Sequence, residues 1–238
     1  MSAIRKTLQI VRNELRIEAR SQEILISTTL FAVLIATLGS LAFYIDRQNA
    51  TSIAPGILWL SIAFSGVLAL SRSWLREREM SVIDGLLCAP ITPNNLYFGK
   101  FIAVLIFMFL VETVVAIIVV VFCHLSHFLS VNIATNVISL ASLLFVGTVG
   151  FIATGTLFAA MSVRSRSREL NLSIVLFPLC APALLAAVVA TREFFSGAEL
   201  STILSWLRIL LAFDLMALVI CPWLFSLLMN DGVQIRPQ

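Results

Sequence analysis

The longest break between the apolar segments of this chain spans residues 74–100, WLREREMSVIDGLLCAPITPNNLYFGK. It begins with four alternating charges that are too polar to enter lipid: Arg76, Glu77, Arg78 and Glu79. Four apolar residues then recur at helical spacing: Val82, Ile83, Leu86 and Leu87. Because side chains three and four positions apart share a helix face, this pattern predicts a short amphipathic helix. Such a helix either rests on a membrane surface or docks onto a cytoplasmic partner.

Turn residues delimit this helix. Pro90 and Pro93 are expected to end it, because proline cannot continue a helix. Gly99 and Lys100 are expected to close the loop before the next apolar run begins at Phe101.

The composition indicates that the chain lies in a membrane. Of its 238 residues, 60% are hydrophobic and only 12% are charged, whereas a soluble domain has about 25% charged residues. We therefore predict an all-α integral membrane protein that forms a single membrane domain over residues 1–238. The chain leaves no room for a separate soluble catalytic domain beside its apolar segments.

Six apolar segments are long enough to cross a bilayer as helices. The predicted spans are residues 24–44, 53–70, 101–122, 137–161, 170–191 and 203–228. Pro178 and Pro182 predict a kink or an interruption in the fifth span. In the fourth span, small residues predict a surface for close helix packing: Gly147, Gly150, Thr154, Gly155 and Ala159.

The charge distribution predicts the orientation. Thirteen of the 16 Lys and Arg residues lie in the N-terminal region, the 71–100 and 162–169 segments and the C-terminal tail. The positive-inside rule therefore places both termini and residues 74–100 in the cytoplasm. Residues 1–23 carry a 4-3-4 apolar pattern at Ile4, Leu8, Val11 and Leu15 with basic residues beside it, which predicts an amphipathic helix at the membrane interface.

Two acids lie deep inside predicted spans. Glu112 is about 16 Å along the third span, and Asp214 is well inside the sixth. Acids at such depth are costly and usually face a bundle interior, a cavity or a partner helix, which favours a functional role. The alternative is a protonated or hydrogen-bonded packing residue.

His124 and His127 follow the third span three positions apart, and they would share a face if the helix continued. Two imidazoles could bind a metal or provide an axial ligand to haem iron; the alternative is interfacial polarity alone. The chain contains neither a phosphate-binding loop nor a catalytic triad pattern, so we assign no catalytic residue and expect no ATP hydrolysis by this chain alone.

The topology is similar to that of the membrane half of a type-2 ABC exporter. Several segments in order resemble the haem exporter protein B (CcmB) family of cytochrome c maturation: residues 14–21, 76–79, 84–87 with Pro90, 99–100, 155–160 and 211–214. The resemblance covers nearly the whole chain, from residue 8 to residue 228.

This resemblance implies a permease subunit in a bacterial inner membrane. It would pair with a CcmA-type ATPase that binds ATP, in two copies with an ATPase dimer, and work with CcmC-type and CcmD-type proteins. The ATPase cycle would be linked to haem export or to release of a haem-loaded CcmE-type chaperone. The chain carries no tryptophan-rich haem-binding motif, so haem would be held mainly by a partner. No nucleic acid is expected as a partner.

In the docking hypothesis, the apolar side chains at 82, 83, 86 and 87 insert into an ATPase cleft, while residues 76–79 and Asp84 form ion pairs at its rim.

Other functions remain open on the sequence. The topology equally suits a type-2 exporter of a lipid or other small molecule. A further alternative is a membrane scaffold that gathers the ATPase and the haem-handling proteins without forming a translocation path. A membrane-embedded enzyme is the weakest alternative.

Overall fold

The computed structural model describes residues 3–42, 50–79, 92–123, 133–163 and 168–234. These residues form seven α-helices. The helices are α1 (Ala3–Ser21), α2 (Glu23–Ala42), α3 (Ala50–Glu79), α5 (Pro93–Phe122), α7 (Ile133–Val163), α8 (Arg168–Phe195) and α9 (Leu200–Gln234).

Six of the described helices, all except α1, are long and apolar enough to cross a membrane, which confirms the six predicted spans. Several extend beyond the predicted limits: α3 and α5 have 30 residues each, or about 45 Å at 1.5 Å per residue. Because a bilayer core is about 30 Å thick, the ends of these helices project beyond it.

The 74–100 break is shorter than the sequence suggested. Helix α3 continues to Glu79, and α5 begins at Pro93, so the prediction that Gly99 and Lys100 close a loop was wrong. Pro93 starts a helix here because the first helical position needs no N–H donor and suits the fixed φ of proline. The remaining residues, 80–91, lie outside the described part of the chain.

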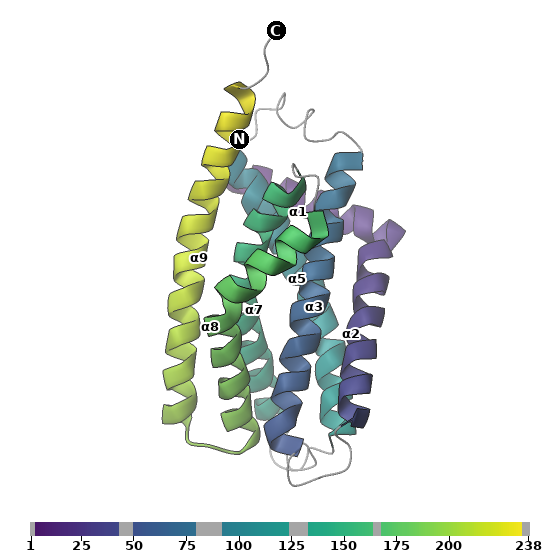
Figure 1. Cartoon of the computed structure of the whole chain (residues 1–238), viewed down its shortest axis with the longest axis vertical. Coiled ribbons are helices and arrows are strands. Elements are labelled where there is room, and N and C mark those ends of the chain that lie inside the picture. The colour runs from purple at the N-terminus through teal and green to yellow at the C-terminus, as the bar shows by residue number, and fades with distance from the viewer. Residues whose placement is uncertain (1–2, 43–49, 80–91, 124–132, 164–167, 235–238) are drawn as a thin grey trace.

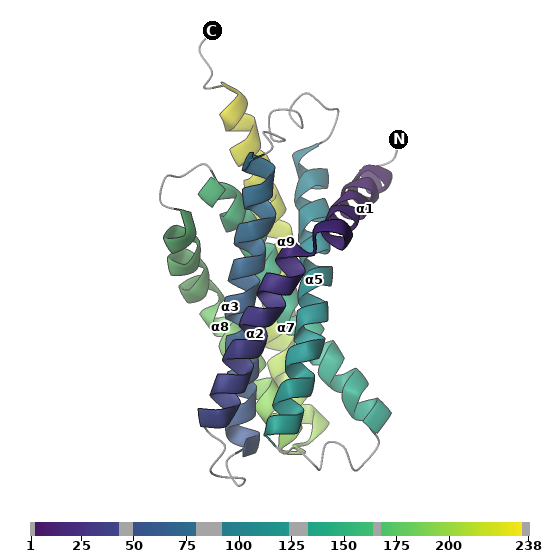
Figure 2. The same ribbon diagram turned by 90° about the vertical axis from the view of Figure 1, so that its right-hand side faces the viewer.

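The helices form an upright bundle with α1 inclined against one end (Figures 1 and 2). Helices α3, α5 and α7 are the more buried spans, and α2 and α9 are the more exposed. The end of α9 and the start of α1 lie toward the same end of the bundle, as an even number of crossings requires. Helix α8 is one unbroken helix that contains Pro178 and Pro182, and its ribbon changes direction along its length in Figure 1. That the two prolines cause this bend stays a prediction.

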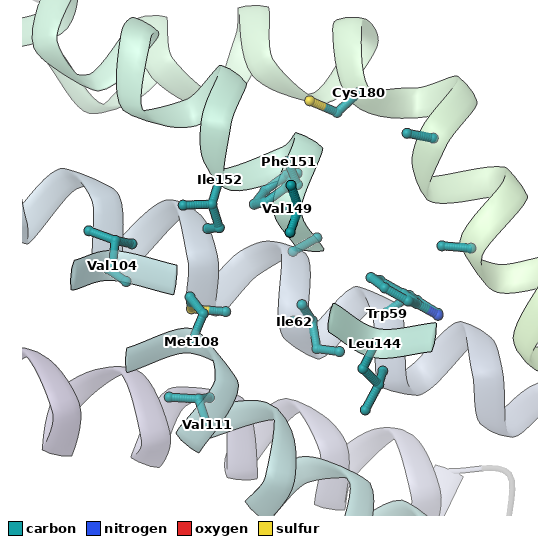
Figure 3. Packing of buried hydrophobic residues seen from close by; sticks show 14 of the residues in the cluster. Trp59, Ile62, Val104, Met108, Val111, Leu144, Val149, Phe151, Ile152 and Cys180 are labelled. Atoms are coloured by element: carbon teal, nitrogen blue, oxygen red, sulfur yellow. The ribbon is translucent and has the colours of Figure 1, made fainter. Parts of the chain in front are cut away.

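Helix α7 packs closely against its neighbours through glycines. A Cβ atom at Gly147 would lie 2.8 Å from Trp59 Cζ2 of α3, and one at Gly150 would lie 2.7 Å from Phe213 Cδ1 of α9. Leu70 of α3 fills the corresponding notch at Gly155. These contacts confirm the predicted small-residue packing surface. Figure 3 shows the core that results, in which side chains of α3, α5 and α7 interdigitate.

The contact at Gly147 generates a prediction. Trp59 is buried and its Nε1–H donates to Thr191 Oγ1 at 2.9 Å, so the ring cannot move aside without losing that bond. We expect Gly147→Ala to lower the free energy of unfolding by about 1–3 kcal/mol through overpacking. The measurement is the unfolding midpoint of the purified protein in detergent.

Gly56→Ala is the matched control, because a Cβ atom at Gly56 would meet no atom within 4 Å. It makes the same helix-favouring exchange without a clash. Equal midpoints for the two variants would contradict the account of α7 packing.

Candidate functional site

The face that α1 turns toward the bundle carries acids. Val11, Glu14 and Glu18 are all less than 7% exposed and share one side of the helix. Ile4 and Leu8, in contrast, are 80% and 65% exposed. The predicted amphipathic helix is therefore present, with part of its apolar face directed away from the bundle. Its position in a membrane interface stays a prediction.

Glu14 forms a buried ion pair with Lys100 of α5. Glu14 Oε1 lies 2.9 Å from Lys100 Nζ, and the two side chains are 8% and 1% exposed. The ammonium also donates to the backbone carbonyl of Ser73 at 3.4 Å and lies 5.7 Å from the centre of the Trp74 ring, both on α3. We call Glu14, Lys100, Ser73 and Trp74 the Lys100 cluster. It joins α1, α3 and α5.

Two further contacts hold α1 in place. A Cβ atom at Gly99 would lie 2.6 Å from Ile10 Cγ2, so the missing side chain of Gly99 lets α1 approach α5 closely. Glu18 Oε1 accepts a hydrogen bond from the backbone N–H of Leu25 at 2.8 Å, in the first turn of α2. The first N–H groups of a helix have no partner within it, so this carboxylate satisfies one of them. The turn between α1 and α2 is made at Gln22, whose φ is 52°.

The Lys100 cluster lies close to the 80–91 segment in the chain. Helix α3 ends at Glu79, five residues after Trp74, and α5 begins at Pro93, seven residues before Lys100. At 1.5 Å per residue these separations are about 8 and 11 Å along the helices. The cluster thus fixes α3 and α5 to each other at the base of this connection.

The sequence contained a signal for this cluster. Glu14 and Glu18 are four positions apart and face away from the most exposed apolar residues of α1. Lys100 follows directly on the helical segment 93–99 and precedes a long apolar run. The opposite charges of these acids and of Lys100 could have suggested an ion pair. The sequence does not show, however, that α1 and α5 are neighbours.

Glu112 of α5 is buried, with 1% of its surface exposed. The hydroxyl of Thr148 on α7 donates to Glu112 Oε1. Glu112 Oε2 finds no hydrogen-bond partner among the described residues. Thr148 was not singled out from the sequence, because hydroxyls within apolar helices usually bond to their own backbone.

Asp214 of α9 is buried against α7, near the part of α7 that also contacts Glu112. It is 5% exposed, and its Oδ1 lies in the notch left by the missing side chain of Gly150. Among the described residues Oδ1 has no hydrogen-bond partner. Thr148 and Gly150 are two residues apart, so both acids contact the same short part of α7.

The structure leaves several predicted site residues untested. Arg76, Glu77, Arg78 and Glu79 belong to the last turns of α3, but their side chains are not described. The predicted docking residues of the 80–91 segment lie outside the described residues: Val82, Ile83, Asp84, Leu86 and Leu87. His124 and His127 also lie outside them. In the described ranges, no group of three His, Cys, Asp or Glu side chains is arranged to hold a metal ion.

Comparison with known proteins relates this chain to one family. The family model described as CcmB protein matches residues 5–230. A protein of Paracoccus denitrificans (strain Pd 1222) named heme exporter protein B is 28% identical over 193 residues, which cover 81% of this chain and 84% of that protein.

The buried ion pair generates a prediction. Lys100→Met should lower the free energy of unfolding by about 3–5 kcal/mol, because it leaves the Glu14 carboxylate buried without a counter-ion. Adding Glu14→Gln should recover much of this loss, because the double variant buries no unpaired charge. Unfolding midpoints of the two single variants and the double variant in detergent form the test.

Arg72→Met is the matched control, because Arg72 and Glu23 form an exposed pair at 3.4 Å with side chains 38% and 69% exposed. An exposed pair contributes about 0–1 kcal/mol. A Lys100→Met effect as small as that of Arg72→Met would refute the structural importance of the buried pair.

Proposed function

This chain belongs to the CcmB family, and from that premise we propose that it is the membrane subunit of a haem exporter that serves cytochrome c maturation. The family match covers nearly the whole chain, and the relative that bears the name heme exporter protein B covers most of it. The protein is a multi-pass protein of a bacterial inner membrane, with six membrane-spanning helices.

In this proposal ATP is hydrolysed by a separate CcmA-type ATPase, because the chain contains no phosphate-binding loop. Two copies of the subunit would serve an ATPase dimer. The ATPase would dock at residues 76–87, on the cytoplasmic side given by the distribution of Lys and Arg. The length of α3 and α5 supports this position, because each helix is about 45 Å long, about 15 Å more than the thickness of a bilayer core, and can extend into the water where a soluble ATPase lies.

The observation that carries the mechanism is the Lys100 cluster. When the ATPase subunits close, they would push the docking segments together and tilt the attached α3 and α5. Because the buried ion pair joins these helices to each other and to α1, the three would move as one unit instead of sliding apart. The motion would then be passed along α5 toward Glu112.

The other proposed partners are CcmC-type and CcmD-type membrane proteins and a CcmE-type haem chaperone. The ATPase cycle would drive haem export or release of the haem-loaded chaperone. Haem would be held mainly by these partners. His124 and His127 follow the C-terminal end of α5, which lies opposite the Lys100 cluster, so they remain the candidate ligands for haem on the outer side.

The docking hypothesis predicts the effect of two variants. Leu86→Asp places a charge on the apolar docking face, and Glu79→Lys reverses a charge at its rim. Each should abolish co-purification of the ATPase while leaving membrane insertion intact, because the distribution of Lys and Arg predicts that both positions are cytoplasmic. Glu199→Lys is the matched charge reversal, on an exposed residue at the opposite end of the bundle. Retention of the ATPase by both docking variants would exclude this role.

A second prediction separates a transport subunit from a scaffold. Glu112→Gln and Asp214→Asn keep the size of each buried side chain but remove its ability to ionise. If the acids act in a translocation path or in a conformational change that the ATPase drives, both variants should reduce the yield of c-type cytochromes at least severalfold while the complex still assembles. Thr113→Val, on the exposed face beside Glu112, should leave the yield unchanged. Normal maturation in both acid variants would favour the scaffold.

A further inference from the structure

Arg208 lies on the face of α9 that is directed away from the bundle. It is exposed, and so are the apolar residues within two turns of it on the same face. These are Leu204, Leu211 and Leu215, which are 50%, 47% and 65% exposed. Among the described residues Arg208 forms no ion pair, and Asp214, six positions further along α9, is buried against α7. The charge of Arg208 is therefore available to an anion that comes from the surroundings of the bundle.

Two tryptophans of α9 indicate the depth of Arg208 in the membrane. Trp206 and Trp223 are 17 positions apart, or about 26 Å along the helix. This separation is close to the thickness of a bilayer core, about 30 Å, and tryptophan is enriched at both membrane interfaces. Trp206 would then lie at one interface, with Arg208 two positions, about 3 Å, further into the bilayer.

This interface is the outer one in the predicted orientation. The N-terminal end of α9 lies opposite its C-terminal end in Figure 1, and the distribution of Lys and Arg places the C-terminus in the cytoplasm. Side chains of a helix tilt toward its N-terminus, so the long side chain of Arg208 is directed toward the outer interface. Lipid phosphates lie there, and an Arg side chain can reach them while its stem stays in the apolar region.

Hydrogen-bond acceptors follow Arg208 toward the same interface. Ser205 and Ser201 precede it by three and seven positions, so all three share a face of α9. The hydroxyl of Ser205 donates to the carbonyl of Ser201 at 2.9 Å, and the hydroxyl of Ser201 donates to Glu199 Oε2 at 3.3 Å. Because both hydroxyl protons are engaged, both hydroxyl oxygens are left as acceptors. Glu199 is exposed and adds a negative charge beyond them.

We call Glu199, Ser201, Ser205 and Arg208 the outer α9 site. A hollow of about 380 Å³ lies on the same part of α9 and offers room for a small polar group. Its lining consists of Ser201, Thr202, Ser205, Trp206 and Ile209.

We propose that the outer α9 site binds a phospholipid with an amine headgroup, such as phosphatidylethanolamine, whose phosphate pairs with Arg208 and whose ammonium is held by Glu199 and the serine oxygens. The order of the charges supports this choice. The cation of the site lies nearer the bilayer middle and its anion nearer the water, and the phosphate and ammonium of such a lipid are arranged in the complementary order. Glu199 and Arg208 are nine positions apart, about 14 Å along the helix, and the direction of the Arg208 side chain shortens this gap.

Other occupants fit the outer α9 site less well. A phospholipid with a glycerol headgroup would satisfy Arg208, but it would bring no cation to Glu199. A helix of another protein would have to present an acid and a base at matching positions, whereas one zwitterionic headgroup carries both charges. This inference does not depend on which substrate is exported.

The test measures lipid binding to the full chain, purified from its native membrane in a mild detergent. Phosphatidylethanolamine and phosphatidylglycerol with the same acyl chains are titrated in separately, and native mass spectrometry identifies each bound lipid by its mass. We expect the first phosphatidylethanolamine to bind at least tenfold more tightly than the first phosphatidylglycerol.

Two substitutions test the roles of the two charges. Arg208→Gln should weaken binding of the first phosphatidylethanolamine at least tenfold, because it removes the partner of the phosphate. Glu199→Gln should reduce the preference over phosphatidylglycerol to less than threefold, because it removes the partner of the ammonium. Arg192→Gln is the matched control, since Arg192 is an exposed Arg in the last turn of α8 at the same end of the bundle. It should change binding less than twofold.

Three results would overturn the proposal. The first is phosphatidylglycerol binding as tightly as phosphatidylethanolamine in the unaltered chain. The second is an equal loss of binding in Arg208→Gln and Arg192→Gln, or no loss in either. The third is a protein that co-purifies without bound lipid and that Arg208→Gln alone releases, which would identify a partner helix as the occupant. Because the readout is the mass of a bound molecule and not cytochrome yield, failure here is distinct from failure of the proposed haem export.

Discussion

The close approach of α7 to its neighbours is the constraint on which the rest of the bundle depends. In a bilayer, apolar side chains gain little by leaving lipid for another helix, so association relies on close packing and on hydrogen bonds between helices. Helix α7 supplies both. Its glycines receive side chains of α3 and α9, its Thr148 bonds to Glu112 of α5, and its Ala153 carbonyl accepts a hydrogen bond from Tyr97 at 2.8 Å. Three helices are positioned by one segment of α7.

The number of spans, the N-terminal helix and the packing face of α7 could be predicted because each depends on local composition. A lipid solvent requires an unbroken apolar helix, so hydropathy alone locates the spans. The limits of the 74–100 break could not be predicted in this way. Gly99 and Lys100 have the composition of a loop, yet they lie within α5 because distant residues accommodate them: Ile10 fills the space at Gly99, and Glu14 neutralises Lys100.

In the candidate site, too, the features that depend on local composition could be predicted, and those that depend on contacts between distant residues could not. The depth of Glu112 and Asp214 in their spans predicted that both would avoid lipid and face the bundle interior, a cavity or a partner helix, since an acid cannot face lipid without cost; both are buried inside the bundle. Their common contact with α7 depends on the rotation of three helices, which no single-sequence pattern records. The Lys100 cluster went unpredicted for the same reason. Its members come from three helices, and only the folded bundle brings them together.

The pairing of Glu14 with Lys100 also has a consequence for biosynthesis. Helix α1 is synthesised before α5, so Glu14 has no counter-ion until α5 has been made and inserted. Until then Glu14 must stay hydrated at the membrane surface, because a carboxylate without a counter-ion is too costly to bury. Helix α1 therefore docks through Glu14 later than its place in the chain would suggest, and its docking marks the point at which α1, α3 and α5 are all in place.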